Sequence, residues 1–183
     1  MAEKKTRYVT PIGEAKWAWL TKPKAGFAGD PNKDPKFMID VVFDITKDPA
    51  WAKWGADLRA MSKGLKLPIK KELDANDQPT GRFFVTFKTG EKYPPGVFDK
   101  YNQAVPESVL VGNGSKVRVA YTVNEYDGFG GGINLYLSAV QVVDLVEYKG
   151  RGAEGYGFTA EPIPQGAMAS AGGPPQAEDD LPF

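Results

Sequence analysis

Four segments of the chain alternate apolar and polar residues with a period of two, and this pattern restricts the fold more than any other feature. The segments are residues 36–45, 82–89, 115–126 and 133–145. A period of two places alternate side chains on opposite faces of a β-strand, so one face can be buried while the other meets solvent. Two weaker segments, 7–13 and 14–20, are interpreted either as two strands or as one strand interrupted by a bulge at 11–13.

Residues 48–64 break this alternation and have the spacing of a helix. Asp48 can cap the N-terminus of a helix, and Pro49 suits its first turn. The apolar residues that recur at helical spacing are Trp51, Trp54, Leu58 and Met61. The helix should end near Gly64. We expect an amphipathic helix that covers one end or edge of the sheet.

The number and length of these elements predict a small all-β domain. A chain of 183 residues can bury one sizeable core. Residues 127–132, DGFGGG, supply the positive φ angles of a hairpin between the last two strands. Five or six strands and one helix fit an OB-fold-like antiparallel barrel. A two-sheet sandwich is the alternative, because periodicity does not distinguish the two architectures.

The composition excludes several classes of function. The chain contains no Cys and no His. Disulfide scaffolds, thiolate catalysis and His-based catalysis are therefore excluded, and we predict no enzyme activity, no cofactor and no metal site. Asp40 and Asp44 share a strand face, but two acids are too few for a magnesium-dependent nuclease. No apolar run is long enough for a membrane span or a signal peptide, so we expect a cytoplasmic protein with no membrane partner.

Charge is divided unevenly along the chain. Residues 1–151 contain all 23 Lys and Arg and 18 of the 23 acids, whereas residues 152–183 contain five acids and no base. A cationic body joined to an anionic end indicates a body that binds a polyanion and an end that imitates one. The end is rich in Gly, Ala, Pro and Ser, which cannot fill a core. We therefore expect a folded domain over 1–151 and a disordered acidic tail over 152–183.

The outward faces of the predicted strands combine cations with aromatic rings. Alternation points Phe83, Val85 and Phe87 inward and leaves Phe84 outside between two cations. Such surfaces suit single-stranded nucleic acid, because Lys and Arg bind phosphates while rings stack on bases. The candidate DNA-binding residues are Lys16, Trp17, Trp19, Lys22, Lys24, Lys36, Arg82, Phe84, Lys88, Lys116, Arg118 and Tyr136.

Each of these assignments has a structural alternative. Large aromatic residues in a small barrel usually pack inward, so Trp17 and Trp19 could belong to the core. A register error of one residue would bury Phe84 and Tyr136. The Lys-rich stretch 62–73 could contact phosphates or form an ordinary solvated loop.

The end of the chain resembles a known family. EDDLPF, after a Gly/Pro/Ala-rich spacer, is similar to the acidic C-terminal tip of bacterial and bacteriophage single-stranded DNA-binding proteins. Residues 5–149, with DPKFMIDVVFD, the following helix and INLYLSAVQVVDL, resemble the bacteriophage branch more closely. The resemblance implies an OB-fold that binds single-stranded DNA without strong sequence preference in replication, recombination and repair. It also implies the cytoplasm of a phage-infected bacterium.

The same resemblance assigns the tail a role in partner docking. The residues concerned are Glu178, Asp179, Asp180, Leu181, Pro182 and Phe183. They would recruit a polymerase, helicase or nuclease, although the tip has fewer acids than many relatives. A tethered acidic tail can also compete with DNA for a cationic groove. Exposed sheet edges permit a homodimer. The alternative function is a β-sandwich protein-interaction or virion-associated module.

Overall fold

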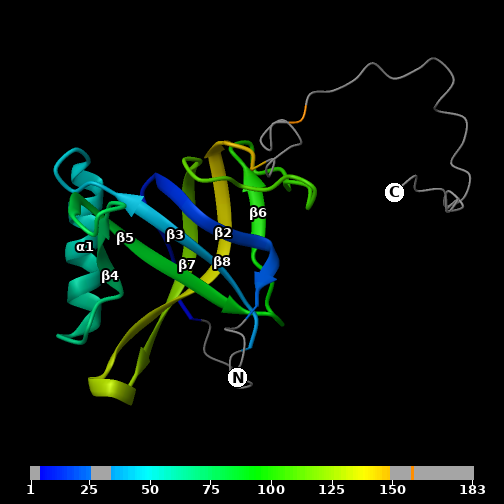
Figure 1. Cartoon of the computed structure of the whole chain (residues 1–183). Coiled ribbons are helices and arrows are strands. Elements are labelled where there is room, and N and C mark those ends of the chain that lie inside the picture. The colour runs from blue at the N-terminus through cyan, green and yellow to red at the C-terminus, as the bar shows by residue number, and fades with distance from the viewer. Residues whose placement is uncertain (1–4, 26–33, 149–157, 159–183) are drawn as a thin grey trace, which may run out of the picture. The chain divides into compact units, whose positions relative to one another are not determined.

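The computed structural model describes residues 5–25, 34–148 and 158. These residues form eight strands, one α-helix and one 3-10 turn (Figure 1). The strands are β1 Arg7–Val9, β2 Gly13–Lys24, β3 Lys36–Phe43, β4 Ile69–Leu73, β5 Pro79–Gly90, β6 Gly96–Asp99, β7 Lys116–Tyr126 and β8 Gly132–Asp144. The helix α1 is Pro49–Ser62 and the 3-10 turn η1 is Gly128–Gly130. The prediction of an all-β body with one helix is confirmed.

Five of the strands close into a ring. β2 pairs with β3, β3 with β5, β5 with β8, β8 with β7, and β7 again with β2. All of these pairings are antiparallel except that of β5 with β8, which is parallel. The strands belong to one sheet, so the architecture is the OB-fold-like barrel and not the two-sheet sandwich.

Three short strands extend this ring: β1 lies within the predicted segment 7–13, whereas β4 and β6 go beyond the predicted five or six strands. β1 pairs with β7, β4 with β5, and β6 runs parallel to β8. β4 lies inside the Lys-rich stretch 62–73, so part of that stretch is a strand and not a loop. With five and four residues, β4 and β6 are too short to show a convincing period of two.

The first two strands decide between the two interpretations of residues 7–20. Residues 7–20 are not one strand with a bulge at 11–13, because β1 and β2 are separate strands. Between them, the backbone N–H of Thr10 donates to the carbonyl of Val119 at 3.0 Å, and the Thr10 hydroxyl accepts from the Val119 N–H at 3.0 Å. The buried Thr10 therefore continues the contact with β7 while the chain passes from one strand to the next.

Helix α1 forms as its sequence predicts. The Asp48 carboxylate accepts a hydrogen bond from the Ala50 N–H at 2.9 Å, and Lys63 ends the helix in the left-handed conformation. Figure 1 shows α1 beside one end of β3 and β5. Its buried Trp51 stacks on Phe43 of β3, with ring centroids 4.3 Å apart, and donates its indole N–H to the Ile12 carbonyl at 2.8 Å. The helix thus closes one end of the barrel.

A second tryptophan of α1 connects the helix to the opposite wall. The Trp54 indole N–H donates to the Tyr121 hydroxyl of β7 at 2.9 Å. Tyr121 is 1% exposed, and burial raises the pKa of its phenol to about 12. The phenol therefore remains protonated at neutral pH.

The predicted hairpin at 127–132 is confirmed. η1 joins β7 to β8, and φ is positive at Phe129, Gly130 and Gly131. Glycine adopts these angles without strain, which explains the Gly-rich composition of the turn. Phe129 lies fully exposed within this turn.

The contact of α1 with the barrel can be tested by removing its most buried ring. Trp51→Ala should lower the free energy of unfolding by about 3–5 kcal/mol, because it opens a cavity against Phe43 and also removes the hydrogen-bond donor of the Ile12 carbonyl. Urea unfolding measures this loss. Trp17→Ala is the matched control, since that ring is 62% exposed, and it should cost under about 1 kcal/mol. Equal losses in the two variants would contradict the packing of α1.

Candidate nucleic-acid interface

A bulge in β2 turns two tryptophans outward. The register of β2 against β3 shifts between Lys16 and Trp19, and Trp17 adopts a φ of 50°. The Trp17 backbone N–H donates to the side-chain oxygen of Asn113 at 2.9 Å, which holds the irregular conformation. Trp17 is 62% exposed and Trp19 is 42% exposed. The two rings are therefore surface residues, and the core interpretation is wrong for both.

One row of side chains crosses four strands on the outer face of the barrel. In register, Trp19 of β2 lies opposite Met38 of β3, Met38 opposite Lys88 of β5, and Lys88 opposite Tyr136 of β8. Directly opposite residues share a face and lie about 5 Å apart. The Lys5 amine lies 5.9 Å from the centroid of the Tyr136 ring, at one end of this row. We call Trp19, Met38, Lys88 and Tyr136 the Trp19 row.

Lysines gather around the Trp19 row. Lys24 lies opposite Lys36 where β2 and β3 pair, and Lys70 of β4 lies opposite Phe84. Burial lowers the pKa of Lys88, and the positive charges of Lys36, Lys70 and Lys24 lower it further. Because these charges act on one amine, they belong to one surface. We call Lys24, Lys36, Lys70 and Lys88 the lysine patch.

One acid lies within the lysine patch. Asp40 of β3 lies opposite Lys16 on one side and Thr86 on the other. Burial raises the pKa of the Asp40 carboxyl, against the hydrogen bond from Thr86 and the charges of Lys88, Lys70 and Lys24. This carboxylate reduces the positive charge at the centre of an otherwise cationic surface.

Two of the predicted cations, Lys16 and Arg82, are already engaged with the acid Glu72. The buried Glu72 of β4 accepts hydrogen bonds from the Lys16 amine, from Arg82 Nε at 2.7 Å and from Thr80 at 2.8 Å. Arg82 also lies 3.3 Å from Glu14. Burial favours the neutral form of Glu72, but these hydrogen bonds outweigh it and lower its pKa.

Glu14 engages a further predicted cation. The Lys116 amine lies 3.6 Å from the Glu14 carboxylate. Lys16, Arg82 and Lys116 therefore neutralise Glu14 and Glu72, and they contribute less net charge to the surface than the sequence suggests.

Phe84 lies in a hollow beside the lysine patch. The hollow has a volume of about 380 Å³ and lies between β2, β3, β4 and β5. Its lining residues are Lys16, Trp17, Asp40, Val42, Lys70, Lys71, Glu72, Leu73 and Phe84. Phe84 is partly exposed. Because Trp17 and Lys16 line the same hollow, the structure brings these three predicted residues together.

The remaining predicted residues fall in different places. Lys22 is exposed and lines an apolar hollow of about 440 Å³ together with Trp17, Trp19 and Tyr148. Arg118 is exposed on β7, where it lies opposite Gln141 of β8, and Gln141 in turn pairs with Phe98 of β6. Arg118 is therefore not part of the Trp19 row.

Several residues of this surface are absent from the set proposed from the sequence. They are Lys5, Met38 and Asp40, whereas Lys70 belongs to the Lys-rich stretch 62–73 that was proposed as a possible phosphate contact. Alternation within 36–45 puts Met38 and Asp40 on the same face as Lys36, so this signal was present in the sequence. The long-range contact of Lys5 with Tyr136 has no such local signal.

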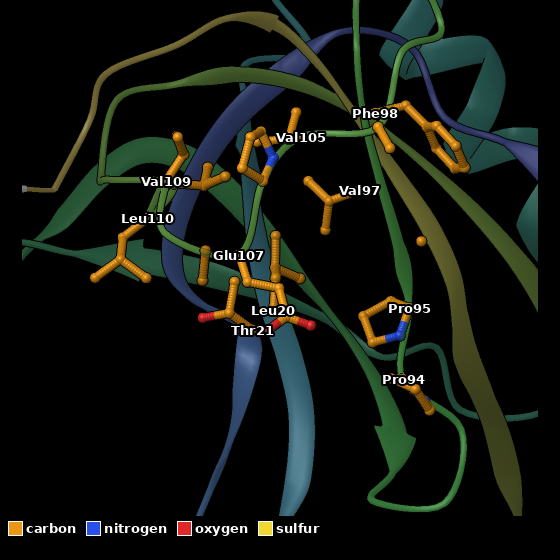
Figure 2. Close-up of a pocket in the computed structure, with 15 residues that line it drawn as sticks. Leu20, Thr21, Pro94, Pro95, Val97, Phe98, Val105, Glu107, Val109 and Leu110 are labelled. Carbon is orange, nitrogen blue, oxygen red and sulfur yellow. The ribbon is translucent and has the colours of Figure 1, made fainter.

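A further hollow is less suited to DNA. It lies between Leu20 and Thr21 of β2, Val97 of β6, and the segments before and after β6 that contain Pro94 and Leu110 (Figure 2). Its volume is about 250 Å³, and Glu107 is the charged side chain among its described lining residues. A lining without a described Lys or Arg offers no ion pair to a phosphate.

Apart from Phe158, the predicted tail over 152–183 lies outside the described residues, and so do all six candidate docking residues from Glu178 to Phe183. Among the residues that are described, no group of three acids is placed to hold a metal ion. No helix in this part of the chain is long and apolar enough to cross a membrane.

Comparison with known proteins supports the fold. No family model matches the sequence, and no curated protein matches it significantly. The structure of gp2.5, a single-stranded DNA-binding protein encoded by bacteriophage T7, is similar with a TM-score of 0.61 and 18% identity, over 86% of this chain and 96% of that chain. The single-stranded DNA-binding protein of bacteriophage Enc34 in complex with ssDNA has a TM-score of 0.60 and 18% identity, over 81% and 100% of the two chains.

A C-terminally truncated form of the Enc34 protein is also similar, with a TM-score of 0.59 and 20% identity over 77% of this chain and 87% of that chain. The chain therefore has the fold of bacteriophage single-stranded DNA-binding proteins. The resemblance expected from the sequence is confirmed at the level of the fold.

The ion-pair network around Glu72 predicts a dependence of stability on pH. At pH 7, Glu72→Gln should lower the free energy of unfolding by about 1–3 kcal/mol, because Lys16 and Arg82 lose a charged acceptor. The folded-state pKa of Glu72 is lowered, so its contribution is present above the unfolded pKa of 4.5 and is lost as pH falls through the folded value. The difference between the two proteins should therefore shrink on acidification.

Urea unfolding from pH 7 to about pH 3 measures this difference. Glu125→Gln is the matched control, because that side chain is 53% exposed and lies 3.7 Å from Lys63. It should change stability little at any pH. A Glu72→Gln difference that stays constant on acidification would show that the charge of Glu72 does not stabilise the fold.

Proposed function

We propose that the chain binds single-stranded DNA across the outer face formed by β2, β3, β5 and β8. The observation that carries this proposal is the Trp19 row with the lysine patch around it. Lys24, Lys36, Lys70 and Lys88 bind phosphates, while Trp19 and Tyr136 stack on bases. Each stacked base contributes about 1–3 kcal/mol.

The position of this face agrees with how OB-folds bind oligonucleotides. That fold uses its second and third barrel strands and the loops after its first and fourth strands. The corresponding strands here are β3 and β5, and the loop after the fourth barrel strand is the turn that carries Phe129. Phe129 offers a further exposed ring on which a base of the DNA can stack beyond the Trp19 row.

The chemistry of the face favours single strands over duplex. Rings stack only on bases that are not already stacked and paired. Stacking also tolerates every base, so the preference for sequence is weak. Phosphate contacts release counterions, so affinity should fall steeply with salt. Arg118 would contact DNA only where the bound DNA continues around the barrel onto β7.

We further propose that the protein coats and protects single-stranded DNA in phage replication, recombination and repair. Support comes from the two phage proteins, T7 gp2.5 and that of Enc34, whose structures share this fold and are described as single-stranded DNA-binding. β1, β4 and β6 each pair with one neighbour among the described strands, and such edges permit a homodimer.

The tail over 152–183 is proposed as the partner-docking segment. The chain leaves the barrel at a defined place, because the Tyr148 N–H donates to the Leu110 carbonyl at 2.8 Å and the Gly112 N–H to the Val146 carbonyl at 2.7 Å. From there, its acids compete with DNA for the lysine patch. When DNA displaces it, Phe183 and the neighbouring acids bind a polymerase, helicase or nuclease.

DNA binding is tested by titrating labelled oligo(dT) and a duplex at several salt concentrations. Oligo(dT) should bind more tightly and quench tryptophan emission, because Trp17 and Trp19 are exposed while Trp51 and Trp54 are buried. Lys88→Ala should weaken binding about 3- to 10-fold at low salt and reduce the salt slope by about 0.7. Lys53→Ala, on the exposed side of α1, is the matched control and should change neither quantity. Absence of oligo(dT) binding by both the full chain and a chain lacking residues 176–183 would refute the proposal.

The tail is tested by deleting residues 176–183. The deletion should tighten oligo(dT) binding about 3- to 10-fold at low salt, because the tethered competitor is lost. It should also abolish capture of replication proteins in a pull-down. Phe183→Ala is the control that separates the two effects, since it keeps the acids and should impair capture alone. Unchanged DNA affinity after deletion would refute competition by the tail.

A further inference from the structure

The hollow that contains Phe84 has features of a site for one nucleobase. Its volume of about 380 Å³ is ample for a base, and the rings of Trp17 and Phe84 both line it. Two further lysines of its lining, Lys70 and Lys71, can bind the adjoining phosphates. Aromatic walls with cations nearby are the combination that binds unstacked bases.

Two carboxylates line this hollow, and they differ in how many hydrogen bonds their oxygens already accept. Glu72 accepts hydrogen bonds from Lys16, Thr80 and Arg82, so both of its oxygens are engaged. Asp40 accepts one hydrogen bond among the described residues, from the Thr86 hydroxyl to Oδ1 at 2.6 Å. This contact orients the Asp40 carboxylate and leaves acceptor capacity on Oδ2.

A carboxylate in the middle of a phosphate-binding surface weakens DNA binding unless it makes a contact of its own. Asp40 lies among Lys24, Lys70 and Lys88, where it opposes the attraction of the phosphates. An ionised carboxylate can only accept hydrogen bonds. The donors that DNA offers are the N–H groups of its bases, whereas its phosphates are acceptors.

We propose that the hollow holds one base of the bound strand and that Asp40 accepts a hydrogen bond from its amino group. This inference rests on the proposed binding of single-stranded DNA and adds a modest base preference to it. Cytosine N4 and adenine N6 are amino donors, whereas thymine presents a carbonyl oxygen at the corresponding position. The N3–H of thymine lies between two carbonyl oxygens, which repel the carboxylate. Amino-bearing bases are therefore favoured over thymine.

The experiment measures binding of the full chain to oligo(dC) and oligo(dT) of equal length. Asp40→Asn keeps the shape of the side chain and an oxygen for the Thr86 hydroxyl, but it removes the acceptor-only character. The ratio of the oligo(dT) to the oligo(dC) dissociation constant should fall about fivefold or more relative to the unchanged protein. Asp57→Asn, on the exposed side of α1, makes the same change of charge and should leave the ratio unchanged.

A second variant tests the orientation of the carboxylate. Thr86→Val removes the hydroxyl that holds Asp40 but keeps the charge, so it should also lower the ratio. Thermal unfolding checks that each variant is folded. Equal tightening of both oligonucleotides in Asp40→Asn would mean that Asp40 only repels phosphates, and it would overturn the inference while DNA binding stands. Binding of neither oligonucleotide by the unchanged protein would overturn the proposed function and this inference together.

Discussion

The parallel pairing of β5 with β8 is the contact on which the rest of the structure depends. It places Lys88 opposite Tyr136 and closes the ring of β2, β3, β5, β8 and β7. Closure gives the strands a common interior, where Val85, Phe87 and Leu137 are buried. The same pairing sets a cation beside a ring on the outer face. The core and the candidate interface therefore have one physical origin.

Electrostatics divides the outer face into two parts. Around Glu14 and Glu72, cations are paired with acids and hold β2, β4, β5 and β7 together. Around the Trp19 row, burial lowers the pKa of Lys88, and the charges of three lysines on β2, β3 and β4 lower it further, which indicates excess positive charge. The surface suited to a polyanion is thus smaller than the area over which outward cations are spread, because some of these cations are paired with acids.

The longer elements of the fold could be predicted because their patterns are local. Residues 36–45 and 133–145 alternate over enough positions to show a period of two, and Asp48 with Pro49 marks the start of the helix. β6 is four residues long and gives no such signal. The bulge at Trp17 could not be predicted, because it depends on a hydrogen bond to Asn113, which is distant in sequence.

The sequence by itself determined the alternation of the longer strands, the absence of His and Cys chemistry, and the division between a cationic body and an acidic tail. Only the tertiary structure decided that Trp17 and Trp19 are exposed and that Trp19, Lys88 and Tyr136 form one row. It also decided that Arg82 is paired with Glu72. The physical reason is that alternation acts within a strand, whereas register and ion pairs join segments distant in the chain.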